Sequence, residues 1–166
     1  VQISGNYLGV DASGLVKASL DGNGRNEGIV LFVAGKTGST FGGENPQDRN
    51  IVANSSYGSA SVQFDSDSGF IFGNYIGIGK DGVTDLVSGL GIQLGSFNGG
   101  GSSNIVGGNT LNPATDTRLN VFSGNGNAQL TVFGSNNIVQ GNRIGTDYTG
   151  ALTASITNGV GIGAAF

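Results

Sequence analysis

Two aspartates, Asp65 and Asp67, have the spacing of a pair that could hold a metal ion. The segment from residue 65 to residue 69 reads Asp-Ser-Asp-Ser-Gly, the form that opens a Ca²⁺ loop, in which alternate carboxylates converge on a hard cation. The acidic residue that closes such a loop is missing, because Ile76 stands near its place. Ca²⁺ is therefore the one cofactor that the sequence leaves open, and we favour a solvated turn.

Two other aspartates, Asp11 and Asp147, stand at equal distances before Gly14 and Gly150. This shared position predicts that both carboxylates cap a turn. Glycoside hydrolysis needs two carboxylates that flank one bond, and the Asn-Thr-Asp, Asp-Asp and Gly-His-Gly motifs expected of a pectin-type hydrolase do not occur. We predict no catalytic residue and no enzymatic activity.

The composition excludes several further kinds of chemistry. The chain has no His and no Cys, which removes Ser-His-Asp and Cys-His catalysis, structural zinc, haem and iron–sulfur ligation. A net charge of −4 with 7 Lys and Arg argues against nucleic-acid binding. No apolar run is long enough to span a membrane. The chain also contains no Met and starts at Val1, so we expect a processed or excerpted part of a longer repeat array.

A 68-residue superrepeat organises the glycines, which number 33 in a chain of 166 residues. The segment that begins Gly5-Asn6 recurs at Gly73 and again at Gly141, and the offset is constant, since 73 − 5 = 68 and 141 − 73 = 68. We predict that the members of this set are structural turn or ladder residues: Gly5, Asn6, Gly9, Gly14, Gly73, Asn74, Gly77, Gly82, Gly141, Asn142, Gly145 and Gly150. Asn tolerates left-handed backbone geometry, and its amide can stack on an Asn of the neighbouring coil.

Short apolar segments between these turns predict the elements that position them. Asn followed by two strand formers occurs at residues 50–52, 104–106, 120–122 and 137–139. Such short strands at even spacing predict an all-β solenoid of 1–166 as a single domain. Dividing the repeat by three gives roughly 23 residues per coil, so we predict about seven coils.

The segments 137–150 and 39–52 resemble the repeats of bacterial right-handed parallel β-helix proteins, whose superrepeat reads like N-x-I-G-G … R-N-V-I-S-G-N … N-x-I-x-G-N-x-I-G-T-D-x-x-G. The resemblance covers essentially the whole chain. The first copy departs from it at Val10, and the second at Ile78 and Gly79. It implies a right-handed, single-stranded parallel β-helix in a secreted or cell-surface protein, and some such proteins are polysaccharide lyases or hydrolases.

Two functions remain open at this point. The first is a non-catalytic structural or adhesive module that pairs with neighbouring repeats, or with identical subunits in a fibre, through the open ends of the solenoid. The second is a polysaccharide-binding or polysaccharide-degrading domain, which rests on the resemblance alone. Tyr7 and Tyr75, replaced at the same repeat position by Arg143, leave an aromatic platform for sugars open, and we favour an outward aromatic ladder. The variable stretches 15–27, 42–49, 95–103 and 112–117 are the loops in which we expect specificity. Asn54 begins the one N-x-[ST] sequon.

Overall fold

The computed structural model describes residues 1–18, 31–55, 59–96, 99–108, 115–151 and 160–164. Within these residues the fold is all-β, with one short 3₁₀ helix, η1 (Pro46–Asp48). No helix in these ranges is long and apolar enough to cross a membrane. The all-β prediction is thus confirmed.

Three parallel sheets contain all the strands named here, and each sheet has five. Sheet 1 consists of β1 (Gln2–Ile3), β4 (Thr40–Gly42), β7 (Phe70–Phe72), β10 (Ile105–Val106) and β13 (Ile138–Val139). Sheet 2 consists of β2 (Tyr7–Leu8), β5 (Ile51–Val52), β8 (Tyr75–Ile76), β11 (Val121–Phe122) and β14 (Arg143–Ile144). Sheet 3 consists of β3 (Leu31–Thr37), β6 (Ala60–Asp67), β9 (Leu90–Leu94), β12 (Ala128–Val132) and β15 (Val160–Ala164).

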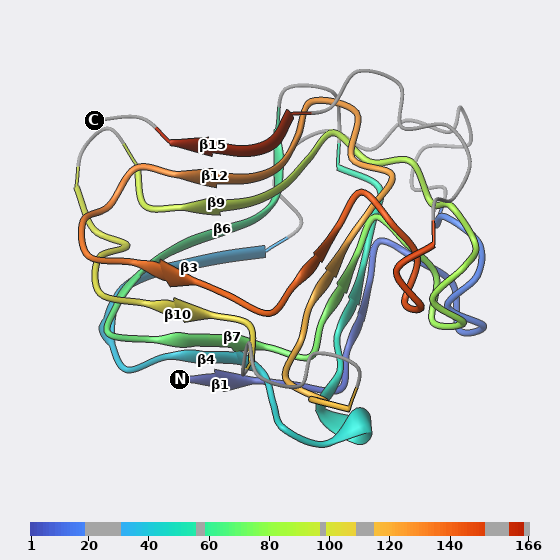
Figure 1. Ribbon diagram of the computed structural model, residues 1–166, viewed down its shortest axis with the longest axis horizontal. Coiled ribbons are helices and arrows are strands. Elements are labelled where there is room, and N and C mark those ends of the chain that lie inside the picture. The colour runs from blue at the N-terminus through green and yellow to red at the C-terminus, as the bar shows by residue number, and fades with distance from the viewer. Residues whose placement is uncertain (19–30, 56–58, 97–98, 109–114, 152–159, 165–166) are drawn as a thin grey trace.

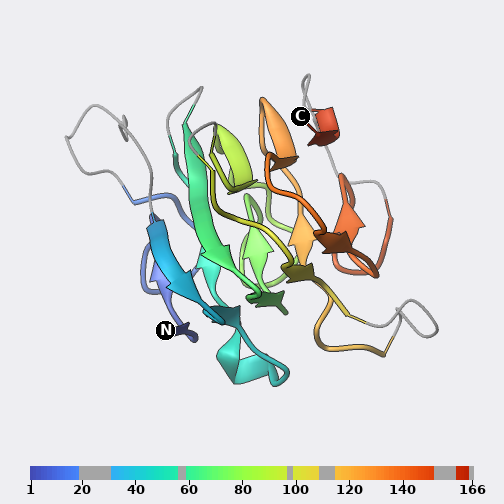
Figure 2. The same ribbon diagram turned by 90° about the vertical axis from the view of Figure 1, so that its left-hand side faces the viewer.

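The chain visits the sheets in the fixed order 1, 2, 3, so every three successive strands make one coil. Figure 1 shows the three sheets on three sides of one interior, and Figure 2 shows the coils following one another from the N-terminal to the C-terminal side. We number the coils 1 (β1–β3) to 5 (β13–β15). This arrangement is compatible with a parallel β-helix.

The described strands make five coils, so the prediction of about seven coils is wrong for this part of the chain. Gln2 pairs with Thr40, which pairs with Phe70, so one period of the repeat, from 2 to 70, holds two coils. Each coil therefore takes roughly 34 residues, which is within the usual range for solenoid repeats. Phe70 is related to Ile138 through Ile105 in the same way. The coils are longer than predicted because each carries an external loop.

The interior is filled by side chains that alternate inward along the strands. Phe41, Phe64 and Phe122 are fully buried and share one cluster with aliphatic residues from every sheet. Each such side chain contributes roughly 1.5–3 kcal/mol on burial, so this apolar interior is a major source of stability.

The external loops alternate between two corners of the solenoid. In odd-numbered coils the connection from sheet 2 to sheet 3 is long, and the one from sheet 1 to sheet 2 is short. In coil 4 the lengths are reversed, and in coil 2 the two connections, residues 43–50 and 53–59, are of nearly equal length. We call residues 11–17, 79–85 and 147–151 the odd-coil loops, and residues 43–49, 107–108 and 115–119 the even-coil loops. The superrepeat of the sequence is thus the period of these loops.

Candidate functional site

An asparagine ladder runs through all five coils at the corner between sheets 1 and 2. Each Asn precedes a strand of sheet 2, and from coil 2 onward its carboxamide oxygen accepts hydrogen bonds from the backbone N–H and the Nδ2 of the Asn one coil earlier. Asn74, for example, donates to Asn120 Oδ1 from its N at 2.9 Å and from its Nδ2 at 3.0 Å. The ladder consists of Asn6, Asn50, Asn74, Asn120 and Asn142.

The sequence-predicted Asn6, Asn74 and Asn142 are three members of this ladder. Asn50 and Asn120 were not in the predicted set, although the Asn–apolar–apolar form that they share with the others was visible in the sequence. The 68-residue spacing relates only the Asn residues of the odd-numbered coils to one another. The even-coil loops differ in length, so the Asn residues of the even-numbered coils do not share this spacing. Asn50, Asn74 and Asn120 are fully buried. Their carboxamides therefore supply the hydrogen bonds that water would otherwise make to the backbone groups of the turn.

All nine glycines of the predicted set have positive φ angles, between 61° and 88°. Gly77 meets two separate requirements for glycine. Its φ is 79°, in the left-handed region, and a Cβ there would lie 2.0 Å from the Ser123 carbonyl oxygen of the next coil. A left-handed backbone without a side chain lets successive coils approach to sheet spacing. Gly9, Gly73 and Gly77, where a Cβ would meet a backbone carbonyl of a neighbouring coil, therefore serve the close stacking of coils.

Two of the odd-coil loops, those of coils 1 and 5, are closed by the predicted aspartates. Asp11 accepts hydrogen bonds from the Ser13 hydroxyl and the N–H groups of Leu15 and Val16. Asp147 accepts them from the Thr149 hydroxyl and from the N–H groups of Thr149 and Ala151. The hydroxyl hydrogen bond is the leading cause that holds the pKa of each carboxyl below its usual value.

The middle odd-coil loop uses a different aspartate, which was not among the residues predicted from the sequence. Gly79 stands where Asp is expected, but Asp81, two residues later, accepts hydrogen bonds from Val83 N, Thr84 N and the Thr84 hydroxyl. Desolvation opposes ionisation of Asp81, yet these hydrogen bonds lower its pKa. The signal was present as a carboxylate one residue before Gly82.

Neighbouring odd-coil loops bond directly to each other across the intervening even coil. Lys80 N donates to Gly14 O at 2.9 Å, and Tyr148 N donates to Gly82 O at 3.0 Å. The loops also cover the outer face of sheet 2, where Val10 and Ile78 belong to a second apolar cluster with residues of β5, β8 and β11. Val10 and Ile78, at which the chain departs from the repeat pattern that it resembles, thus serve as packing residues.

Cationic and aromatic side chains alternate over the outer face of sheet 2, between the two rows of loops. The Arg49 guanidinium lies 4.0 Å above the centre of the Tyr75 ring, and Lys80 Nζ lies 5.9 Å from that of Tyr7. Arg143 and Tyr148 line the same hollow as Arg49 and Tyr75. We call the surface formed by these six residues the cationic channel: Arg49, Lys80, Arg143, Tyr7, Tyr75 and Tyr148. In the ranges that the structure describes, the one ion pair is Arg118–Asp116, so none of the channel cations forms an ion pair there. The Asp116 carboxylate, held by Arg118, lines the same hollow as Arg49 and Arg143.

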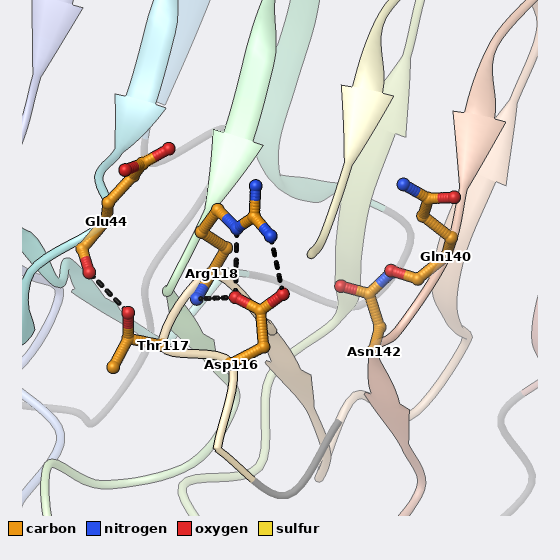
Figure 3. A network of polar contacts seen from close by, with 6 residues as sticks. All are labelled: Glu44, Asp116, Thr117, Arg118, Gln140 and Asn142. Atoms are coloured by element: carbon orange, nitrogen blue, oxygen red, sulfur yellow. Dashed lines mark hydrogen bonds and ion pairs between the residues drawn. The ribbon is translucent and has the colours of Figure 1, made fainter. Parts of the chain in front are cut away.

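The even-coil loops meet at a second polar network, shown in Figure 3. Asp116 holds the Arg118 guanidinium by two hydrogen bonds, from Nε at 2.9 Å and from Nη2 at 2.8 Å. Thr117 Oγ1 donates to Glu44 O, which joins the loops of coils 2 and 4. A Cβ at Gly108 would lie 2.4 Å from Asp116 Oδ2, so a larger residue there would displace the Asp116 carboxylate.

The predicted metal pair, Asp65 and Asp67, lies along β6, where both carboxylates have protein donors. Asp65 Oδ2 accepts from Gln63 Nε2 at 3.0 Å, and Asp67 Oδ1 accepts from Ser102 N at 2.8 Å. Burial raises the pKa of Asp65. Among the described residues, no three acidic residues come together as they would at a metal centre.

The remaining sequence predictions fall partly outside the described residues. The stretch 42–49 is an even-coil loop, whereas 19–27, 97–98 and 112–114 of the other predicted loops lie outside. Asn54 of the sequon is buried, and its Nδ2 donates to Ala18 O.

Comparison with family models, with curated proteins and with solved structures finds no match to this chain.

Proposed function

We propose that this chain is a non-catalytic structural and adhesive repeat module, built as a right-handed parallel β-helix, of a secreted or cell-surface bacterial protein. The observation that carries the proposal is the asparagine ladder. Every coil uses the same amide to bind the next, so the fold is organised for rigidity and extension along one axis. Right-handedness follows from the nearly universal hand of crossovers between parallel strands.

The two end coils present the surfaces through which such a module extends. Among the described strands, those of coils 1 and 5 have a neighbour on one side only. Ile3 and Leu8 at one end, and Val139 and Ile144 at the other, are only partly buried. In the described contacts Asn6 Oδ1 accepts no hydrogen bond, and the Asn142 N–H donates none. We propose that a further coil, from the same array or from a second copy, pairs here.

A charged substitution at one end coil tests end-to-end pairing. Ile162 pairs in register with the buried Leu130 and is 48 % exposed. Ile162→Lys places a charge at this end, so it should abolish association seen by sedimentation velocity or light scattering. Val83→Lys, at a loop residue that is also 48 % exposed, is the matched control. A parent chain that stays monomeric over a wide concentration range would contradict the stacking.

Binding of an acidic polysaccharide is the second candidate function, and the cationic channel favours it. Three cations without an ion-pair partner among the described residues gather there, in a chain whose net charge is −4. The exposed rings of Tyr7 and Tyr148 can pack against sugar rings, while Arg and Lys pair with carboxylates. Tyr75 is buried beneath Arg49 and serves to orient that guanidinium. The channel crosses successive coils, which suits a linear polymer.

Affinity electrophoresis in polygalacturonate tests the second function. We expect retardation that weakens with salt and that Lys80→Gln and Arg143→Gln reduce. Lys17→Gln removes one positive charge from an odd-coil loop and should leave the retardation unchanged. Equal retardation of all three variants would assign the effect to net charge alone. Appearance of unsaturated products would contradict the non-catalytic assignment.

A further inference from the structure

A groove of about 360 Å³ lies on the outer face of sheet 1. The Arg118–Asp116 pair separates it from the cationic channel, because Arg118 lines the groove and Asp116 lines the channel. Phe70 and Phe72 from coil 3 and Ile105 from coil 4 form its apolar part, and Gly107 and Gly108 contribute no side chain. Phe70 is 38 % exposed, and the two phenyl rings are tilted by 42° with their centres 5.4 Å apart. Concave sites of this size, apolar with a few polar groups, are where small ligands bind.

Three planar polar side chains from three coils form the other wall. Arg118 lies between Glu44 of coil 2 and Gln140 of coil 5, as Figure 3 shows. The guanidinium is fixed from below by Asp116, which is 9 % exposed, while Arg118 itself is 35 % exposed. In the described contacts the Glu44 carboxylate, the Gln140 carboxamide and Arg118 Nη1 have no hydrogen-bond partner. They offer both acceptors and donors to a ligand.

The charge of this groove differs from that of the channel on sheet 2. Glu44 and Arg118 are the two charged residues of its lining, and Asp116 behind the guanidinium pairs with Arg118, so the lining carries no excess of positive charge. An acidic ligand would be repelled by Glu44, and a cation by Arg118. A neutral ligand with an apolar face and several hydroxyls satisfies every group present.

We propose that this groove binds a neutral pyranose unit of a glycan, with a C–H face of the ring against Phe70 and Phe72 and its hydroxyls on Glu44, Arg118 and Gln140. The C–H hydrogens of a pyranose carry a small positive charge, which is attracted to the negative face of a phenyl ring. Arg118 is pre-organised by Asp116, so little side-chain entropy is lost on binding. The proposal is independent of the function of the cationic channel.

Methyl NMR of the whole chain, labelled at the isoleucine δ1 carbons, tests the proposal. The probes are cellohexaose, mannohexaose, maltohexaose and, as an acidic comparison, hexagalacturonate. We expect one neutral hexamer to shift the Ile105 resonance with a Kd of about 1 mM, and to leave the interior Ile71 unmoved. Hexagalacturonate should not shift Ile105.

Variants locate the binding. Phe70→Ala should weaken the neutral hexamer at least tenfold, and Arg118→Lys should weaken it because the fork is lost. Tyr7→Ala removes an aromatic ring of similar exposure, 41 %, from sheet 2 and should have no effect. Glu44→Gln supplies a second test should Phe70→Ala unfold. The proposal is overturned if no neutral hexamer shifts Ile105, if Ile105 prefers the acidic hexamer, or if Phe70→Ala and Glu44→Gln both bind as the parent does.

Discussion

Asn74 has neighbours on both sides in the asparagine ladder. Its carboxamide accepts two hydrogen bonds from Asn50, and it donates to Phe41 O, Phe72 O and Asn120 Oδ1. Asn74→Ala leaves several buried groups without partners, at about 1–3 kcal/mol each. We expect the free energy of unfolding in urea to fall by about 3 kcal/mol or more. Asn6→Ala, at the exposed end of the ladder, should cost less than about 1 kcal/mol, and equal losses would argue against a cooperative ladder.

Gly77 and Gly38 separate two effects of a left-handed residue. Both have φ above 70°, but a Cβ at 77 meets the Ser123 carbonyl oxygen at 2.0 Å, whereas a Cβ at 38 meets nothing within 4 Å. Gly38→Ala should destabilise by about 1–2 kcal/mol through backbone strain alone. Gly77→Ala should destabilise by about 2 kcal/mol more, because coils 3 and 4 must move apart. Similar unfolding midpoints for the two variants would show that the coils can separate at little cost.

The odd-coil loops should give the fold a dependence on acid. The pKa values of Asp11 and Asp147 are lowered in the fold, mainly by the hydroxyls of Ser13 and Thr149. The stability from these carboxylates is therefore present above their unfolded pKa, about 3.9, and is lost as the pH falls through the folded values. Asp147→Asn should lower the thermal midpoint near neutral pH, and the difference from the parent should shrink below about pH 3.

Asp65 is a control for this prediction, because its pKa is shifted in the opposite direction. Burial raises its pKa, so its ionised form opposes folding above the raised value, and protonation relieves this as the pH falls. Asp65→Asn should therefore not lower the thermal midpoint at neutral pH as Asp147→Asn does. If both variants respond to pH alike, global charge rather than the local hydrogen bonds governs acid stability.

Elements could be predicted from the sequence where local chemistry decides them. The strands at 51–52, 105–106, 121–122 and 138–139 follow from an Asn and two strand formers, and the left-handed residues follow from in-register glycines. The length of a coil could not be predicted, because loop length depends on contacts such as that of Thr117 with Glu44. The groove around Arg118 was missed for the same reason, since its residues belong to coils 2, 3, 4 and 5 and share no sequence spacing.

At the scale of the whole molecule, the two rows of loops define a unit of two coils. An odd-coil loop bonds to the next odd-coil loop across one even coil, through Gly14 with Lys80 and Gly82 with Tyr148. The even-coil loops are joined across one odd coil through Glu44 and Thr117. The solenoid should therefore tolerate a change in length by two coils better than by one.

Insertions test this prediction directly. A second copy of residues 70–137, inserted after Asn137, adds one odd and one even coil and preserves both rows of loops. It should raise the urea midpoint and the m-value, because each repeat adds an interface and buried surface. A second copy of 105–137 alone places two even coils side by side and separates the loops of Gly82 and Tyr148. We expect that chain to have a lower urea midpoint than the parent despite its greater length. A urea midpoint that rises equally for both insertions would mean that the sheets alone determine the stability and that the contacts between loops contribute nothing measurable.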